Sequence, residues 1–333
     1  MNSASSQYLG TTTLDNNTRF NINNFGMVFT NAPKGQRYER RNWKTVSFAF
    51  GMNRVADFNR NYTYSGNNTN NSMTQAFVSD ANQYDVSTTN TPGYIGYKSS
   101  LINPDGSGGY YSIVPISGGI MQQKSTQERG RINEYTLSVG GNYKEKLMLG
   151  ATLGIPDFEY QSNSTYQESL APGNTAANPG HFNWFSYNQS LALSGSGINL
   201  KLGAIYKLTD FLRVGAAFHS PTIYSITDIY TPSVTSVINN VQTDLNIDNG
   251  LLLQNRFDYS FTSSWKGLLS ATFILKNIGF ITADYEYVDY STMRYIYPTG
   301  VDDNGLSYKT YEDAMNQSIR NTYQAASNFR IGA

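Results

Sequence analysis

The sequence is informative first for what it lacks. It contains no cysteine, so disulfide bridges and thiolate metal sites are excluded. Charged residues make up only 14% of the chain, against about 25% in a typical soluble domain. The net charge is zero and no basic cluster stands out, so nucleic acid is not an expected partner. The only two histidines, His181 and His219, do not form a metal-binding pattern, and we expect neither metal nor cofactor.

Long apolar runs are also missing. No stretch approaches the roughly 18 consecutive apolar residues of a transmembrane helix. The first residues, MNSASSQYLG, show neither the basic region nor the apolar core of a signal peptide. What replaces charge is Asn, Ser and Thr together with 29 Gly, 26 Tyr and 17 Phe. This mixture is typical of secreted or outer-membrane β proteins, and a membrane role would require a closed barrel.

The stretch from Ile198 to Phe218 carries the clearest structural signal. Ile198, Leu200 and Leu202 alternate with polar or small residues, and after the short turn 207–210 the alternation resumes from Leu212 to Phe218. A period of two predicts strands with one apolar and one polar face, and a short turn predicts antiparallel pairing. The same pattern recurs on either side of Lys144–Lys146 and of Lys276–Asn277.

Connections alternate between short turns and long polar segments. The long ones cover residues 66–129, 168–190, 231–254 and 298–321. This alternation is normal for outer-membrane barrels, with turns on the periplasmic side and loops outside. Each apolar zone is about nine residues long, which suits a tilted strand crossing a bilayer. Five aromatic residues near the zone ends are expected to form girdles: Trp43, Tyr143, Tyr206, Phe218 and Tyr287.

We therefore predict an all-β fold, an antiparallel transmembrane β-barrel formed by residues 1–333 as a single domain. About eight strands are expected, with a ninth starting near Ser327. They cover residues 21–29, 45–64, 132–143, 147–166, 191–206, 211–227, 257–275 and 279–295. A short helix is expected at Tyr308–Tyr323 with Thr310 as its N-cap, either as a loop element or as a partner-binding helix.

Three segments, in the same order, resemble the FadL/TodX family of outer-membrane transporters, especially members from Bacteroidetes-like bacteria. They are FNINNFGMVFT with the following NWKTVSFAFGMNRVADFNRNYTYSG, then GINLKLGAIYKLTDFLRVGAAFHSPTIYSI, and GFITADYEYVDYSTMRY. The second contains the series Arg213, Gly215, Phe218, Ser220 and Pro221. The similarity covers most of the predicted strands and little of the long loops.

The resemblance implies a fourteen-stranded monomeric barrel with an N-terminal hatch. It also implies passive uptake of hydrophobic compounds such as long-chain fatty acids across the bacterial outer membrane, with lateral exit at a kinked strand. Neither the hatch nor the last strands of the family are found in this sequence, so we expect the chain to be a piece of such a barrel. The expected partners are outer-membrane lipid and a hydrophobic small molecule.

Two basic residues on the predicted lumen face are candidate ligand contacts. Lys201 and Arg213 would attract a carboxylate head group. Alternatively, they would pair with Asp284 and Glu286 or with plug residues. Pro156 cannot donate to a strand ladder, so it predicts a bulge or kink and is a candidate for the lateral opening.

Phe182, Trp184, Phe185 and Tyr187 place four aromatic rings within six residues of a predicted loop. They would line an extracellular apolar groove for the ligand, or they would pack within the loop. Two alternative functions stay open, a general polar porin and a non-transport surface adhesin barrel. An enzyme is not expected, because no Ser-His constellation is present. A soluble β-sandwich would fit only if the alternating faces packed on one another.

Overall fold

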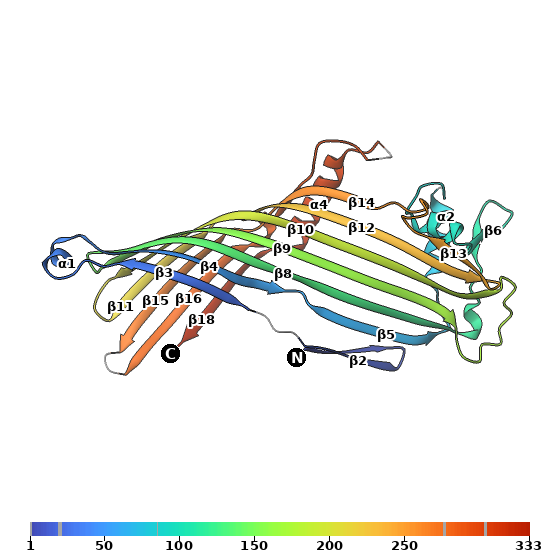
Figure 1. Cartoon of the computed structure of the whole chain (residues 1–333), viewed down its shortest axis with the longest axis horizontal. Coiled ribbons are helices and arrows are strands. Elements are labelled where there is room, and N and C mark those ends of the chain that lie inside the picture. The colour runs from blue at the N-terminus through green and yellow to red at the C-terminus, as the bar shows by residue number, and fades with distance from the viewer. Residues whose placement is uncertain (1, 19–21, 85, 276–277, 303–304) are drawn as a thin grey trace.

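The computed structural model describes residues 2–18, 22–84, 86–275, 278–302 and 305–333, which form a long curled antiparallel sheet, a half-barrel (Figure 1). Nine described strands make the main path of this sheet. In spatial order they are β18 (Ala325–Gly332), β16 (Gly279–Asp289), β15 (Lys266–Leu275), β11 (Leu212–His219), β10 (Phe182–Lys207), β9 (Leu147–Leu170), β8 (Ile120–Tyr143), β4 (Trp43–Asp57) and β3 (Asn24–Asn31).

The remaining strands of this sheet extend it toward one end. β5 (Arg60–Asn68) pairs with β8, and β12 (Ile223–Ile238) pairs with β10, β13 (Val241–Leu245) and β14 (Asn255–Thr262). β17 (Arg294–Ile296) pairs with β14. We call this the loop end, and the opposite end, which carries the short hairpin turns, the turn end (Figure 1).

Short helices and two small hairpins complete the fold. The helices are α1 (Gln36–Arg40), α2 (Thr74–Gln83), α3 (Pro92–Lys98), α4 (Tyr308–Thr322) and the 3₁₀ turns η1 (Ile116–Gly118) and η2 (Tyr290–Thr292). The hairpins are β1 (Asn2–Tyr8) with β2 (Thr11–Asn17), and β6 (Ile102–Pro104) with β7 (Tyr110–Ser112). The first hairpin lies along β5, where Asp15 accepts a hydrogen bond from the Thr63 backbone N–H at 2.7 Å.

The predicted hairpins are confirmed where the structure describes them. Leu202 pairs with Phe218 across β10 and β11, and Tyr143 pairs with Leu147 across β8 and β9. The turn at Lys276–Asn277 lies outside the described residues, but β15 and β16 pair in the predicted antiparallel register up to Leu275 and Gly279. The main path of the described sheet ends in two unpaired edge strands, β3 and β18, so closure into a barrel stays a prediction.

Several predicted loops are wrong, because the strands run far beyond the apolar zones. β10 starts at Phe182 and β12 ends at Ile238, so much of 168–190 and 231–254 is strand. The segment 66–129 contains α2, α3, β6 and β7. The predicted helix near 308–323 is confirmed as α4, but its N-cap is Ser307 rather than Thr310, since Ser307 Oγ accepts from the Lys309 N–H at 3.2 Å.

Three neighbouring strand lines are interrupted at one level of the sheet, which we call the transverse break. Residues 220–222 separate β11 from β12, 263–265 separate β15 from β14, and 290–293 separate β16 from β17. At the same level the pairing of β9 with β10 lapses between Gly154–Asn199 and Asp157–Ser196. The break divides the sheet into a turn half and a loop half.

A hydrophobic core forms at the loop end, where the segment carrying α2 and α3 packs on the sheet. Its members are Phe77, Ala81, Tyr94, Ile95, Leu101, Ile102, Ile113, Val114, Ile120, Phe182, Phe185, Val234, Leu245 and Leu252. Glu168, fully buried beside this core, accepts hydrogen bonds from Ser72 Oγ at 2.5 Å and from the Met73 N–H at 2.8 Å. The same carboxylate accepts from Gln122 Nε2 at 2.9 Å and from the Tyr166 hydroxyl at 2.5 Å, so it joins the start of α2 to the wall.

Candidate functional site: a two-faced wall

Side chains on one face of the sheet are more buried than those on the other, and this difference in burial identifies the concave face. Leu200, Leu202 and Phe218 are 44–46% exposed on one face. Lys201 and Asn199, on the other face of the same strand, are more buried and contact groups on neighbouring strands. Side chains converge on the inside of a curled sheet and diverge on its outside, so the Lys201 face is concave and the Leu202 face convex.

A continuous apolar band covers the convex face of the turn half. The registers align its residues from edge to edge; among them are Phe29, Phe48, Val139, Ala151, Leu202, Phe218, Leu269, Phe273, Ile281 and Ile331. Trp43, Tyr143 and Tyr206 lie in one row at its turn-end margin. At the other margin Trp265 packs on Phe218 and Tyr287, with ring centroids 6.1 and 5.5 Å apart.

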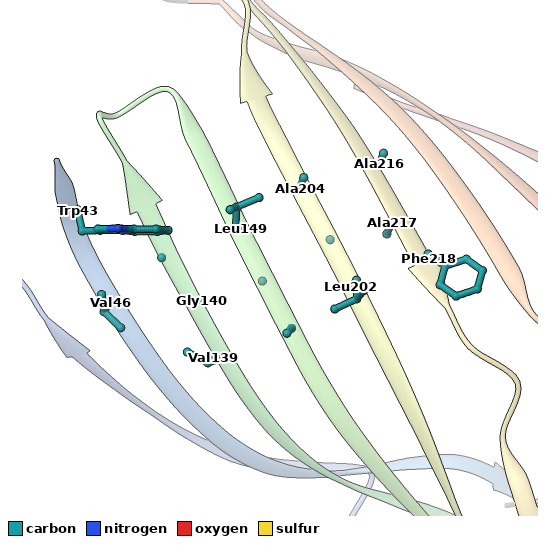
Figure 2. A pocket seen from close by; sticks show the side chains of 14 residues that line it. Trp43, Val46, Val139, Gly140, Leu149, Leu202, Ala204, Ala216, Ala217 and Phe218 are labelled. Carbon is teal, nitrogen blue, oxygen red and sulfur yellow. The ribbon is translucent and has the colours of Figure 1, made fainter.

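A shallow apolar depression of about 810 Å³ lies within this band. Small residues form its floor, because Gly141, Ala151, Ala204 and Ala216 occupy band positions where neighbouring strands carry large side chains. In Figure 2, Trp43 and Phe218 stand at opposite margins of the depression, and Ala204 and Ala216 lie between them. The depression faces outward, so we assign it to the surface of the wall rather than to the concave side.

The polarity of the two faces reverses at the transverse break. In the loop half the convex face is polar, and its residues include Glu159, Gln161, Asn163, Asn188, Ser190, Ser194, Thr227, Arg256 and Asp258. The concave face of the same half carries Phe158, Tyr160, Tyr187, Leu191, Leu193, Tyr224, Ile226, Tyr230, Phe257, Tyr259 and Phe261. In β9, for example, the apolar side chains lie on the convex face up to Ile155 and on the concave face from Phe158, although the register with the neighbouring strands does not shift.

The aromatic rings of the loop half contact one another on the concave side. Phe257 lies 5.0 Å from Tyr297 and 5.8 Å from Tyr259, measured between ring centroids, and Tyr259 lies 5.6 Å from Tyr295. Burial, with Tyr295 and Asp228 beside it, raises the pKa of Tyr259 to about 12. We call this group of Phe257, Tyr259, Tyr295 and Tyr297 the aromatic cluster; it offers π faces together with phenol hydroxyls.

The Asp228 carboxylate lies beside these rings. Asp228 on β12 is opposite Leu193 of β10 and Phe257 of β14, and Ile226 and Tyr230 are its neighbours on the concave face. Burial raises the pKa of the Asp228 carboxyl above its ordinary value. Among the residues that the structure describes, Asp228 makes neither a hydrogen bond nor an ion pair.

Polar side chains bridge the strands beside the transverse break. Glu134 on β8 forms an ion pair with Lys201 on β10, and its second oxygen accepts from Asn199 Nδ2 at 3.0 Å. Asn199 Nδ2 also donates to Thr222 Oγ1 at 3.1 Å. These bonds cross the place where the backbone pairing of β9 with β10 lapses, so side chains hold the strands together there.

The two predicted basic residues are both in the turn half, but with different surroundings. Lys201 is on the concave face as predicted, yet its partner is Glu134 rather than Asp284 or Glu286. Glu286 instead lies 3.5 Å from Arg330. Arg213 is exposed and forms no ion pair within the described part of the chain, so its role as a ligand contact stays a prediction.

Pro156 does not produce a bulge, and the predicted kink at this residue stays a prediction. β9 keeps one register along its whole length with β8 and with β10, although the latter pairing lapses at Ile155–Pro156. Proline has no N–H to donate, which accounts for a lapse without an inserted residue. At Pro156, β9 is therefore paired with β8 but not with β10. The use of this gap as a lateral opening stays a prediction.

The four clustered aromatic residues lie in strand β10, so their assignment to a loop is wrong. Phe182 and Phe185 are completely buried in the core beneath α2 and α3 and present no surface to a ligand. For these two residues the structure agrees with packing rather than with a ligand groove. Trp184 is on the convex side, one residue away from Phe185. Tyr187 alone is on the concave aromatic surface, with its hydroxyl 3.0 Å from that of Tyr230.

Sequence reasoning missed Asp228, Glu134 and the concave aromatic surface. The sequence does contain a signal for the concave aromatic surface, which is a change in the phase of the apolar alternation along a strand. Along 147–166 the apolar residues occupy odd positions up to Ile155 and even positions from Phe158, and the same reversal occurs in β10, from odd positions up to Leu193 to even positions from Ile198. A search that follows the phase of the alternation, rather than its strength, would find it.

Comparisons of this chain with protein-family models, with curated proteins and with solved structures found no match. No helix among the described residues is long and apolar enough to cross a membrane.

Proposed function

We propose that the curled sheet is part of the wall of a transmembrane β-barrel in the bacterial outer membrane, and that the protein takes up hydrophobic compounds. The observation that carries this proposal is the convex apolar band, about nine residues tall and bordered by aromatic rings at both margins. Soluble monomers seldom expose contiguous apolar patches beyond a few hundred Å². A band of this height matches the strand length that crosses a bilayer.

The edge strands β3 and β18 run in the same direction, and this supports closure into a barrel with an even number of strands. The nine described strands of the main path alternate in direction, so β3 and β18 run the same way. A partner that closes the gap by antiparallel pairing alone must therefore supply an odd number of strands. Five would give the fourteen strands that the sequence resemblance implies.

Uptake is the function that best fits the concave side. The turn half has small and polar residues inside, as a wet lumen requires, and the loop half offers aromatic side chains to an apolar ligand. We propose passive diffusion of a hydrophobic ligand from the loop end, with lateral exit from a plugged, monomeric barrel. Long-chain fatty acids are the first compounds to test, on the strength of the resemblance.

The position in the membrane can be tested with the three tryptophans, all of them on the convex side. Variants that keep one tryptophan each, with phenylalanine at the other two sites, are reconstituted in vesicles containing nitroxide-labelled lipids. Trp43 and Trp265 should be quenched by labels near the head groups, and Trp184 should not be quenched at any depth. Equal quenching of Trp184 would contradict the proposed placement.

Uptake itself is tested with radiolabelled oleate in a bacterial host that lacks its own long-chain fatty acid transport. Cells that express the chain should accumulate label faster than cells with empty vector. Absence of uptake together with a steady ion conductance in planar bilayers would favour the porin alternative. Correct insertion with neither activity would favour the adhesin alternative.

A further inference from the structure

Asp228 is a carboxylate without a cation partner among the described residues, and its neighbours on the concave face are aromatic and aliphatic. Its neighbours across the ladder are Leu193 and Phe257, and those along its own strand are Ile226 and Tyr230. The nearest basic side chain in sequence on the adjoining strand, Arg256, is on the convex face, where it pairs with Asp258 at 3.2 Å. The concave position therefore offers Asp228 no partner among the described residues.

A partly buried carboxylate without a partner is unfavourable unless a ligand supplies a hydrogen bond or a positive charge. Removing a carboxylate from water without a compensating hydrogen bond or cation raises its free energy, so buried carboxylates are normally paired. Glu168, a buried carboxylate of this chain, receives four hydrogen bonds. Asp228 is half-buried and receives none from the described residues, although Thr227 beside it on the convex face donates to Asp258 at 2.6 Å. The difference marks Asp228 as a group that faces a ligand.

The rings around Asp228 narrow the chemistry of that ligand. Phe257 and Tyr259 are on the adjoining strand, and Tyr297 packs on both, at 5.0 and 5.9 Å between ring centroids. Aromatic faces attract cations, and a carboxylate beside them adds charge complementarity. We propose that this site binds the cationic head, an amine or quaternary ammonium, of a hydrophobic organic cation.

This inference rests on the proposed function for the route of the ligand, and it changes the expected substrate class. A fatty acid entering from the loop end would bring its carboxylate against Asp228, where like charges repel. Lys201, the basic residue that would attract it deeper in the lumen, is already paired with Glu134. An amphiphile with a positive head and an apolar tail matches the concave surface better than an anionic one.

Binding is measured by isothermal titration calorimetry of the full chain in detergent, with hexyltrimethylammonium as the probe and heptanoate as its anionic counterpart. The cation should bind and heptanoate should not. Asp228→Asn should weaken cation binding about tenfold or more, the size expected when a charge pair of over 1 kcal/mol is lost. Asp228→Glu should restore most of the affinity.

Asp258→Asn is the matched control, because Asp258 is on the adjoining strand opposite Thr227 but on the convex face. It should leave cation binding unchanged. Equal affinity of wild type and Asp228→Asn, or binding of heptanoate as tight as that of the cation, would overturn the inference. Neither result touches the proposed placement in the membrane, since tryptophan quenching reports on insertion without the cation. Failure of the tryptophan-quenching assay with intact cation binding would contradict the membrane placement and leave the cation site.

Discussion

Glu134 and Lys201 form an ion pair over a strand that lies between them. Glu134 belongs to β8 and Lys201 to β10, and β9 passes between the two with Gly154 beneath the contact. A Cβ at residue 154 would come within 2.4 Å of Asn199 Oδ1 and 2.7 Å of Glu134 Oε1. The absence of a side chain at Gly154 is therefore what allows the bridge to lie flat on the wall.

Gly154→Ala is expected to destabilise the folded protein by about 1–3 kcal/mol, because the added methyl group displaces the side chains that bridge β8 and β10. The free energy of unfolding is measured by urea titration of the detergent-solubilised protein. Gly150→Ala is the control on the same strand, since the nearest atom to its new Cβ is Val139 O at 3.8 Å. The explanation fails if both variants unfold at the same urea concentration.

Leu202→Arg places a charge within the convex apolar band. In a bilayer it should cost about 2–4 kcal/mol if Leu202 lies near the midplane. Ser194→Arg, also convex and on β10 but beyond the transverse break, should change the unfolding free energy by no more than about 0.5 kcal/mol. Urea unfolding from lipid vesicles measures both, and similar costs at the two positions would argue against a band immersed in lipid.

Glu168→Ala should loosen the segment that carries α2 and α3. The change leaves Gln122 Nε2 and the Met73 N–H without the acceptor they share, at roughly 1–3 kcal/mol for each buried group left unpaired. Hydrogen–deuterium exchange of residues 74–98 should accelerate while exchange in the turn half stays unchanged. Glu159→Ala serves as the control, because Glu159 is on β9 like Glu168 but is exposed and pairs with Arg131. This variant should leave exchange of the segment that carries α2 and α3 unaltered.

The concave tyrosines predict a loss of stability at alkaline pH. Tyr259 has a pKa of about 12 in the fold, against about 10 in the unfolded chain. The free energy of unfolding is therefore unaffected by this group below a pH of about 10. It falls as the pH rises toward 12, because only the unfolded chain releases the proton. Phenolate absorbance and urea titrations follow the effect, and Tyr259→Phe should reduce its slope; an unchanged slope would mean that Tyr259 ionises freely in the fold.

Local alternation was sufficient for the hairpins and for the apolar band. The register Leu202–Phe218 follows from the positions of Ile198, Leu200 and Val214 around a short turn, since a slip of one residue would exchange the two faces. The helix near Tyr308 was also predictable, but its cap was assigned to Thr310 although Ser307 is the N-cap, and serine is the better cap residue of the two.

Longer strands escaped prediction because their loop halves have few aliphatic residues. β8 and β10 continue for many residues as Gln, Ser, Asn and Tyr, and these read as polar connections when one strand is considered alone. Backbone pairing with neighbours on both sides keeps them extended. The burial of Phe182 and Phe185 required α2 and α3 to fold over them, and no local pattern specifies that contact.

The sequence by itself determined which residues alternate, where the turns fall and where the phase of the alternation changes, because strand geometry sends successive side chains to opposite faces. Only the tertiary structure decided which face became concave, since curvature belongs to the whole sheet. It also decided which distant residues met: Glu134 with Lys201 over Gly154, and Asp228 with Phe257 of the aromatic cluster. Those encounters depend on the register of three or more strands at once.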